Sequence, residues 1–180
     1  MASWMTRALM VATVGLGVGT FAAQDAVAQE STNQVATMTD WSVFVEENPK
    51  ECWGVSKPKE TVNTRDGQVV TARRGDIRLL VFWRPDQNIR GQVMFAGGDP
   101  FAGGSTVQMD VGGTKYDFFT EGETAWPATP EDDARFVAAM KRGADATLVG
   151  RSGRGTMTSD KFSLRGFTAA VEEAARRCGG

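Results

Sequence analysis

Short runs in which every second residue is apolar dominate this chain, and turns rich in Gly, Pro and Asp separate them. In the strongest run, residues 77–83, both alternating sets are largely apolar, which predicts a central strand covered on both faces. Residues 107–111 alternate, the pair Gly112 and Gly113 tolerates positive φ, and apolar positions resume at Tyr116 and Phe118, which predicts a β-hairpin. Weaker strands are expected at residues 42–45, 69–73, 92–96, 146–150, 155–158 and 161–164. The whole pattern predicts an antiparallel β domain.

Two stretches follow a helical period instead. In the first, Thr129 can cap the helix, Pro130 suits its first position and Gly143 can end it. The second should run from Phe167 to Cys178, where core-forming residues recur at intervals of four, three and four. These residues are Phe167, Val171, Ala174 and Cys178. Because they share one face, this C-terminal helix is expected to dock on the sheet with its thiol buried.

Residues 1–28 have the three regions of an export signal. Arg7 is the one charged side chain of the first segment, an apolar stretch covers residues 8–23, and small residues occupy positions Ala26 and Ala28. This pattern predicts cleavage between Ala28 and Gln29. The alternative is an uncleaved membrane anchor, but the apolar stretch is shorter than the ~20 residues that span a bilayer.

Cleavage leaves 180 − 28 = 152 residues, enough for one domain. Residues 29–40 are polar and lack periodicity, so we expect a flexible N-terminal lead there and the folded domain at residues 41–180. No segment after the leader is long and apolar enough to span a membrane. The mature protein is therefore expected to have no transmembrane segment.

The formal net charge is −2 and stays so after cleavage, because Arg7 and Asp25 are lost together. A nucleic-acid-binding protein needs a clustered excess of Lys and Arg, so we expect neither a nucleic-acid partner nor a polybasic membrane contact. The chain contains no His. Nucleophiles relayed through imidazole and the commonest zinc sites are therefore excluded, and we expect no metal and no cofactor.

The chain has two cysteines, Cys52 and Cys178, and both follow the export signal. In an oxidising compartment this predicts one disulfide between the C-terminus and the start of the folded domain. Two free thiols or a two-thiolate metal site are the alternatives, and the absence of His disfavours the metal site. Closing a loop of about 125 residues stabilises the fold by roughly 4 to 5 kcal/mol in the chain-entropy model.

Several segments together resemble the invasion-associated locus B family of exported α-proteobacterial proteins. They are residues 150–156, residues 160–170, Cys178, Trp41, Cys52 with Trp53, Pro100 with Phe101, Gly104 with Ser105, and Ala125 with Trp126. The resemblance spans almost the whole mature domain. It implies a β-sandwich of immunoglobulin-like architecture in the periplasm or envelope, and a family named for host-cell invasion by pathogenic members. It implies no catalytic residues.

Two loops contain candidate binding residues. Arg151 and Arg154, with Ser152 between them, lie in a glycine-rich segment that could bind a carboxylate, a phosphate or another anionic component. The alternative is a hairpin turn with solvated arginines, in which Arg154 pairs with an acid such as Asp160. Trp126 is a candidate for stacking on a sugar or peptide, although most tryptophans in a chain of this size belong to the core.

Three further patterns have simpler explanations than catalysis. Residues 56–59 match Ser-x-x-Lys, but Pro58 disfavours the helix that this motif must open. Residues 97–105 are rich in glycine but lack the lysine of a phosphate loop, so an extended connection is expected. The acidic residues Glu121, Glu123, Glu131, Asp132 and Asp133 could supply an acid and base pair. Helix capping and a solvated loop explain the same residues without catalysis.

The sequence therefore predicts an exported, non-enzymatic envelope or periplasmic protein. Its expected role is to recognise a protein or surface component through a sheet edge or the arginine loop. The alternative is a small periplasmic hydrolase that uses carboxylates alone. The expected location is the periplasm, with outer-membrane association or secretion as alternatives.

Overall fold

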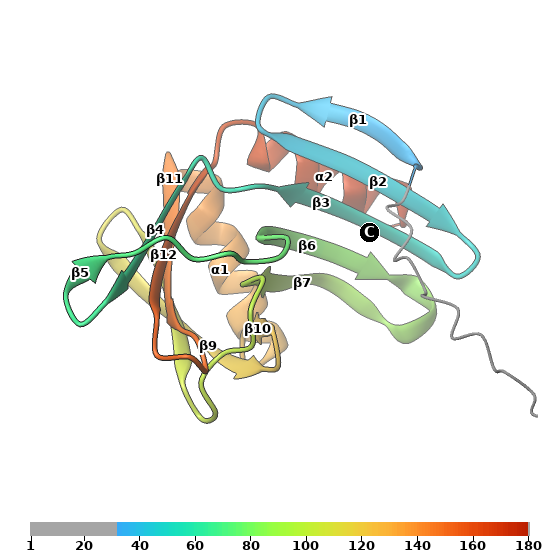
Figure 1. Cartoon of the computed structure of the whole chain (residues 1–180). Helices are drawn as coiled ribbons and strands as arrows, with labels where there is room; N and C mark the ends of the chain where they lie inside the picture. The colour runs from blue at the N-terminus through green and yellow to red at the C-terminus, as the bar shows by residue number, and fades with distance from the viewer. Residues whose placement is uncertain (1–31, 180) are drawn as a thin grey trace, which may run out of the picture. The chain divides into compact units, whose positions relative to one another are not determined.

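The computed structural model describes residues 32–179, so the predicted leader and its cleavage site lie outside the described residues. Within this part of the chain, the strands form one antiparallel sheet of 12 strands. The strand order is β1-β2-β3-β6-β7-β10-β9-β8-β11-β12-β4-β5. Two helices complete the fold (Figure 1). The mainly antiparallel β architecture with two short helices is thus confirmed.

Three groups of elements follow one another along the chain. The first group is β1 (Gln34–Met38), β2 (Trp41–Glu47), β3 (Lys50–Ser56), β4 (Glu60–Arg65) and β5 (Gln68–Val69). The second is β6 (Arg78–Arg84), the 3-10 turn η1 (Pro85–Gln87), β7 (Ile89–Ala96), β8 (Thr106–Val111), β9 (Thr114–Glu121) and β10 (Thr124–Trp126). The third is α1 (Pro130–Arg142), β11 (Asp145–Arg151), β12 (Met157–Ser163) and α2 (Phe167–Arg177).

The sheet has two halves that meet between β7 and β10. This junction is short, because Thr124 and Ala125 pair with Ala96 and Phe95 and no further pairs follow in the described chain. In Figure 1 the strands of the first half, β1, β2, β3, β6 and β7, run in a clearly different direction from β4, β11 and β12 of the second half. The halves share one core, where the Phe95 and Phe162 rings meet edge to face at 6.1 Å. The expected two layers are therefore parts of one continuous sheet.

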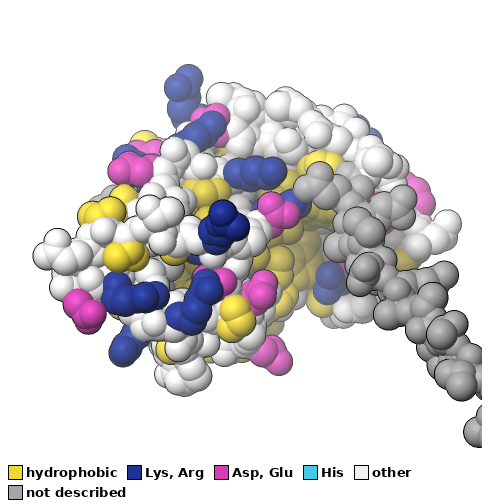
Figure 2. Space-filling view, viewed as in Figure 1, with side chains coloured by type: hydrophobic (Ala, Val, Ile, Leu, Met, Phe, Trp, Pro, Cys, Tyr) yellow, Lys and Arg dark blue, Asp and Glu magenta, His cyan; other side chains and the backbone are white. Residues whose placement is uncertain are grey.

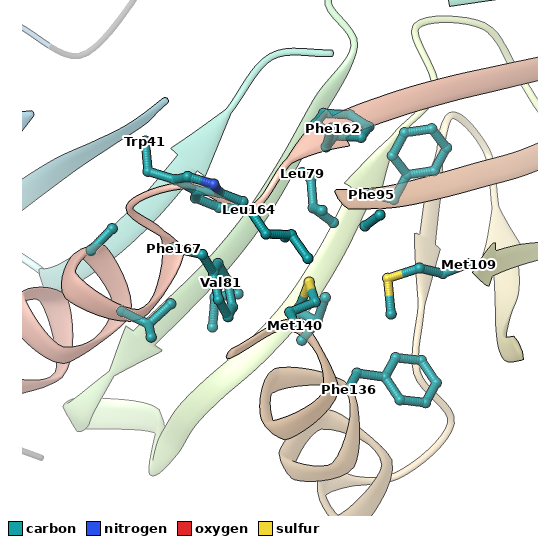
Figure 3. Packing of buried hydrophobic residues seen from close by; sticks show 14 of the residues in the cluster. Trp41, Leu79, Val81, Phe95, Met109, Phe136, Met140, Phe162, Leu164 and Phe167 are labelled. Carbon is teal, nitrogen blue, oxygen red and sulfur yellow. The ribbon is translucent and has the colours of Figure 1, made fainter. Parts of the chain in front are cut away.

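Both helices contribute to the core shown in Figure 3. Phe136 and Met140 of α1 are fully buried, as is Phe167 at the start of α2. The α2 helix packs on β2, β3 and β6, as its apolar spacing predicted. Thr129 caps α1 by accepting a hydrogen bond from the Asp132 N–H, and Gly143 ends the helix. Both predicted helices are confirmed.

A disulfide joins Cys178, just after α2, to Cys52 of β3. The Cα atoms lie 5.9 Å apart, and the two cysteines are separated by 126 positions in the sequence. Both are buried. The predicted bridge is present in the structure and attaches the C-terminal helix to the first half of the sheet.

Gly166 sets the close approach of α2 to the first strand. Its φ is +89°, and a Cβ at this position would lie 1.7 Å from the carbonyl oxygen of Met38. An L side chain therefore fits neither the backbone conformation nor the available space. The glycine allows the chain to turn from β12 into α2 directly beside β1.

Several strand predictions need correction. The expected strand at residues 69–73 is wrong beyond Val69, since residues 70–77 leave the sheet. The runs at 155–158 and 161–164 belong to one strand, β12, whose inward position Asp160 interrupts the apolar pattern. Part of the expected flexible lead, Gln34–Met38, is strand β1 and pairs with β2. Its weak alternation reflects an edge position, where half-exposed residues need not be apolar.

Candidate functional site

The β11–β12 hairpin contains the predicted anion-binding residues, and its turn is closely built. Ser152 is buried, and its Oγ accepts a hydrogen bond from the Thr156 N–H at 3.2 Å. The Gly153 N–H donates to the Pro100 carbonyl at 2.8 Å, and Phe101 forms an isolated β-bridge with Ser152. The hairpin tip therefore rests on the glycine-rich segment 97–105, and the Ser152 hydroxyl has a structural contact.

Arg154 also has structural contacts. Its guanidinium forms an ion pair with Asp99 and donates a 3.4 Å hydrogen bond to the Arg73 carbonyl. The predicted structural pairing is thus correct in kind, but the partner named for it, Asp160, is wrong. That carboxylate lies on the inward face of β12, where Arg74 reaches it from another segment.

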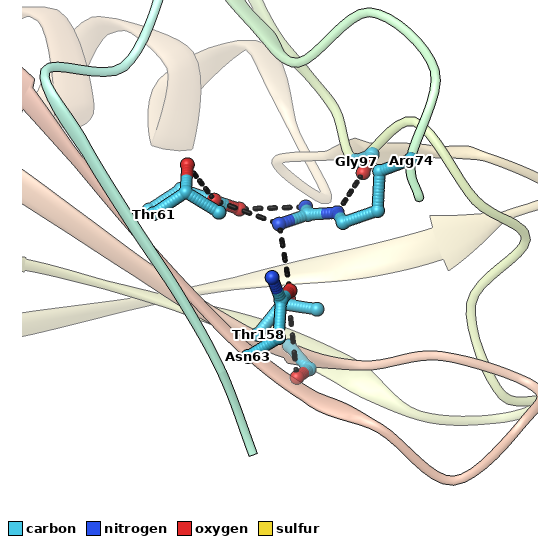
Figure 4. Close-up of polar contacts among 7 residues, drawn as sticks. Thr61, Asn63, Arg74, Gly97 and Thr158 are labelled. Atoms are coloured by element: carbon cyan, nitrogen blue, oxygen red, sulfur yellow. Dashed lines mark hydrogen bonds and ion pairs between the residues drawn. The ribbon is translucent and has the colours of Figure 1, made fainter. Parts of the chain in front are cut away.

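The Arg74–Asp160 pair is completely enclosed (Figure 4). The side chains are 3% and 0% exposed, and two N–O distances of 2.7 and 2.8 Å make the contact bidentate. Arg74 Nε donates to the Gly97 carbonyl at 2.8 Å, and Thr61 Oγ1 donates to Asp160 at 2.9 Å. These bonds satisfy the buried charges and fix the segment around residue 74 against the loop that begins at Gly97.

Four arginines gather around this end of the domain, and they come from separate parts of the chain. Arg65 donates to Thr156 Oγ1 at 2.7 Å, and the Arg73 carbonyl contacts Arg154. Arg151 ends β11 and is exposed. Within residues 32–179, the side chains of Arg73 and Arg151 form no hydrogen bond or ion pair. We call Arg65, Arg73, Arg151 and Arg154 the arginine cluster; the sequence analysis missed Arg65 and Arg73.

Trp126, the other candidate contact residue, ends β10 and is half-buried against Phe82 of β6. Its Nε1 donates to Thr124 Oγ1 at 2.9 Å, and its ring meets Phe82 edge to face at 6.0 Å. The Arg84 guanidinium lies 4.5 Å from the centre of the Phe82 ring. Trp126 thus belongs to a small aromatic group outside the main core. A ligand contact at Trp126 stays a prediction.

Among the five acidic candidates, Asp133 has a distinct environment. It is buried, and its Oδ1 accepts a 2.8 Å hydrogen bond from the backbone N–H of Val93 in β7. The pKa of Asp133 is raised to about 6, mainly by burial and to a smaller extent by the neighbouring Asp132 charge, while the hydrogen bond from Val93 opposes the shift. In the described chain, β10 pairs with β7 only at Phe95 and Ala96, so the Val93 N–H lies outside this pairing. The Asp133 carboxylate provides the hydrogen-bond acceptor for it.

The other acids have separate structural roles. Asp132 accepts hydrogen bonds from Thr129 and Arg135 at the start of α1, where the helix dipole favours negative charge. Glu121 and Glu123 are exposed around the β9–β10 turn. Within residues 32–179, no three His, Cys, Asp or Glu side chains converge to hold a metal ion.

The Ser-x-x-Lys match also has a structural explanation. Ser56 ends β3, and its hydroxyl donates a 2.7 Å hydrogen bond to the Asp40 carbonyl. Lys59 pairs with the Asp40 carboxylate at 2.5 Å, and this contact lowers the pKa of Asp40. No helix begins here, in agreement with the expected loop. Across the described chain, no helix meets the length and hydropathy needed to cross a membrane.

Comparison with protein families places this fold. The family model of invasion-associated locus B (IalB) proteins matches residues 41–175. The chain belongs to the IalB family. Among solved structures it is similar to invasion-associated protein B from Bartonella henselae, with a TM-score of 0.54 and 17% identity over 81% of this chain and 98% of that one. At this identity the likeness shows the fold alone. No curated protein matches the chain significantly.

Proposed function

We propose that this IalB-family protein is an exported, non-enzymatic envelope protein that recognises a protein or surface component through the arginine cluster. The observation that supports the proposal most is the cluster itself, in a chain whose net charge is −2. Asp99 is the acid that pairs with it, through Arg154. Arg73 and Arg151 are exposed and form no side-chain hydrogen bond or ion pair within residues 32–179, and such guanidinium groups suit recognition of carboxylates or phosphates.

Export is supported by the leader sequence and by the cysteines. Both cysteines are buried in one disulfide, and structural disulfides persist in oxidising compartments such as the periplasm. Membership of the IalB family agrees with an envelope location. We place the protein in the periplasm. Association with the outer membrane and secretion are the alternative locations.

A recognition role is favoured over carboxylate-based hydrolysis by the positions of the acids. The raised pKa of Asp133 has a structural cause, since its carboxylate is buried against β7 and hydrogen-bonded to Val93. Glycoside hydrolysis needs a second carboxylate across a cleft at roughly 5 to 10 Å. The remaining acidic candidates lie on exposed surfaces of α1 and the β9–β10 turn.

Crosslinking in intact cells, followed by quantitative mass spectrometry, tests this role. The test variant is Arg151→Ala/Arg154→Ala, and the control is Arg135→Ala/Arg176→Ala, which removes two exposed arginines from the helices. We expect the cluster variant to lose its captured partners and the helix control to keep them. Matching thermal unfolding of the three proteins would show that the fold is intact. If the Arg151→Ala/Arg154→Ala variant captures the same partners as the wild type, the proposed role of the arginine cluster is refuted.

A further inference from the structure

The outer face of the first half of the sheet is apolar, although both helices of the described chain pack on the inner face. In β6, Leu79, Val81 and Trp83 point into the core. Leu80 and Phe82 alternate with them and point to the outer side. Strands with two apolar sides are typical of sheets that are covered on both faces. In Figure 1 the α2 helix lies behind these strands, and Figure 2 shows hydrophobic side chains gathered over β6 and β7 on the side toward the viewer.

Five aromatic side chains form a row across this outer face. Phe44 of β2 lies opposite Trp53 of β3, and Trp53 lies opposite Phe82 of β6. The Phe82 ring meets Trp126 of β10 edge to face at 6.0 Å, and Trp126 lies opposite Phe119 of β9. Side chains directly opposite in antiparallel strands project from the same face, so these rings are neighbours on one surface. We call Phe44, Trp53, Phe82, Trp126 and Phe119 the aromatic row.

The charges beside the aromatic row are mostly acidic. The residues that strand pairing places in line with the row are uncharged, namely Gln34, Gln92 and Thr106. The charged residues two positions along a strand from a member of the row are Glu46, Glu51, Asp117, Glu121 and Arg84. Arg84 pairs with Glu51, so the charge that remains beside the row is negative. This disfavours an anionic partner and favours an uncharged or basic one.

Two hydrogen-bond donors beside the rings are open to a ligand. Within residues 32–179, neither Trp53 Nε1 nor the Gln92 side-chain amide forms a hydrogen bond. Both side chains are half-buried, and their polar atoms reach solvent. Trp126 differs, because its Nε1 donates to Thr124 Oγ1 at 2.9 Å. The row therefore combines apolar rings with free donors at Trp53 and Gln92.

The open area of this face suits a narrow ligand. Phe82 is only 6% exposed, Phe119 is 48% exposed, and the other three rings are half-buried. The next outward row adds the half-buried side chains Val55, Leu80 and Met94. Together the eight side chains leave at most on the order of 600 Å² open, for aromatic side chains of about 150–250 Å² each. Each partner of a stable protein–protein interface contributes about 800 Å², so a single extended chain fits this face better than a second copy does.

We propose that the aromatic row binds a proline-rich segment of a partner protein in the polyproline II conformation. Such a segment rises about 3.1 Å per residue with three residues per turn, so its side chains recur on one side about every 9.3 Å. Two strand spacings measure about 9.6 Å, so successive prolines on this side meet alternate strands of the row. The carbonyls of the segment have no internal partners and accept from donors beside aromatic rings, which Trp53 and Gln92 supply. This inference goes beyond the proposed function, because it does not involve the arginine cluster.

Titration calorimetry with an acetylated decaproline peptide tests the inference on the oxidised protein spanning residues 29–180, which contains the core and the disulfide. Ten residues of polyproline II span about 31 Å. The row crosses from β2 to β9 over five strand spacings, about 24 Å. A Gly-Ser peptide of the same length should not bind, because it is flexible. Lysine at both ends of decaproline should strengthen binding about two- to fivefold, and glutamate at both ends should weaken it as much.

Three variants locate the binding site. Trp53→Ala/Trp126→Ala removes two rings of the row and should weaken decaproline binding about 30-fold or more. Trp53→Phe keeps the ring but loses the N–H donor, and should weaken binding about fivefold. The matched control is Val69→Ser/Met157→Ser, which changes side chains that are 77% and 41% exposed on β5 and β12, outside the row. It should bind within about twofold of wild type. Thermal unfolding checks that each variant is folded.

Acrylamide quenching of the wild-type protein tests the same site without a substitution. Trp41 and Trp83 are buried, so the tryptophans that a quencher reaches in residues 32–179 are Trp53 and Trp126. Both belong to the aromatic row. Bound decaproline should therefore reduce the quenching of tryptophan fluorescence, and the Gly-Ser peptide should leave it unchanged.

The other possible occupants are outcomes of the same experiments. If decaproline neither binds nor reduces quenching, the inference is wrong. Binding of a β-1,4-linked N-acetylglucosamine hexamer in its place would assign the row to a glycan. A dimer that forms with rising protein concentration and shields the tryptophans would assign the row to a second copy. Either result would overturn the peptide inference.

The Arg151→Ala/Arg154→Ala variant separates this inference from the proposed function. It should bind decaproline as the wild type does, because its substitutions lie outside the aromatic row. If it loses decaproline binding, the peptide binds at the arginine cluster and the inference is wrong. If it binds decaproline normally but captures the same partners in cells as the wild type, only the proposed role of the arginine cluster is refuted.

Discussion

Replacing Asp133 by Asn should stabilise the protein at neutral pH, although it removes a charge from a hydrogen-bonded site. The Asp133 side chain is buried between α1 and β7, and its Oδ1 accepts the Val93 N–H at 2.8 Å. An Asn Oδ1 can accept the same bond. The substitution therefore keeps the contact with β7 and removes the cost of holding an ionised carboxylate away from water.

The magnitude follows from the pKa of Asp133, which burial raises from its ordinary value of 3.8 to about 6. A shift of this size corresponds to about 3 kcal/mol between the two protonation states. Because the folded state binds the proton more tightly, wild-type stability from this group is greatest below about pH 4, falls as pH rises to about 6 and then stays low. Asn also loses about 0.5 to 1 kcal/mol of favourable interaction with the helix dipole. Asp133→Asn should therefore be about 2 kcal/mol more stable above pH 7.

Urea unfolding of the oxidised protein, followed by tryptophan fluorescence at several pH values between 4 and 8, measures this difference. The advantage of Asp133→Asn should shrink steadily as pH falls and disappear near pH 4. Glu131→Gln is the matched control, because it removes an exposed charge from the same helical turn and should cost a few tenths of a kcal/mol. An Asn variant that is less stable than wild type at pH 7.5, or a difference that does not change with pH, would refute the reasoning.

Three further experiments test how the fold is held together. Replacing Cys52 and Cys178 together by Ser should lower the free energy of unfolding by about 5 kcal/mol, because the bridge closes a loop of 126 positions; urea unfolding measures it. Asp160→Asn leaves a buried guanidinium without its counter-charge and should cost about 3 to 5 kcal/mol in the same assay. Gly166→Ala should lower the melting temperature far more than Gly155→Ala, since both positions have positive φ but a Cβ meets no atom within 4 Å at Gly155. Equal melting temperatures for these two variants would contradict the account of the α2 start.

The helices and the β6 strand could be predicted because their signals are local. Capping residues, the spacing of apolar positions and a doubly apolar run each depend on neighbours within a few residues. The β12 strand was divided in two because Asp160 occupies an inward position that the pattern reserves for an apolar residue. Its neutralisation by Arg74 depends on a contact across 86 positions. No local pattern contains that information.

The same limit applied to the candidate site. Arg151 and Arg154 were identified because they lie in one short glycine-rich loop, whereas Arg65 and Arg73 join them through contacts across 91 and 81 positions. Net charge averages over the whole chain and cannot report where side chains gather. The exposure of Met157 and Val69 likewise depends on which strands become neighbours. The expected strand at residues 69–73 was wrong beyond Val69 and did not indicate which strand lies beside this residue.

The position of α2 determines when the domain can finish folding. The helix follows every strand of the described chain, yet it covers β2, β3 and β6. When the chain is delivered N-terminus first, the apolar inner face of these strands therefore stays uncovered until α2 follows. The Cys52 thiol likewise has no intramolecular partner until Cys178 follows, 126 positions later. An oxidant that reaches Cys52 early can couple it only to another molecule. Formation of the native disulfide is thus the last event of assembly. A chaperone that keeps β2, β3 and β6 from contacting other molecules until α2 has followed should raise the yield of the native disulfide.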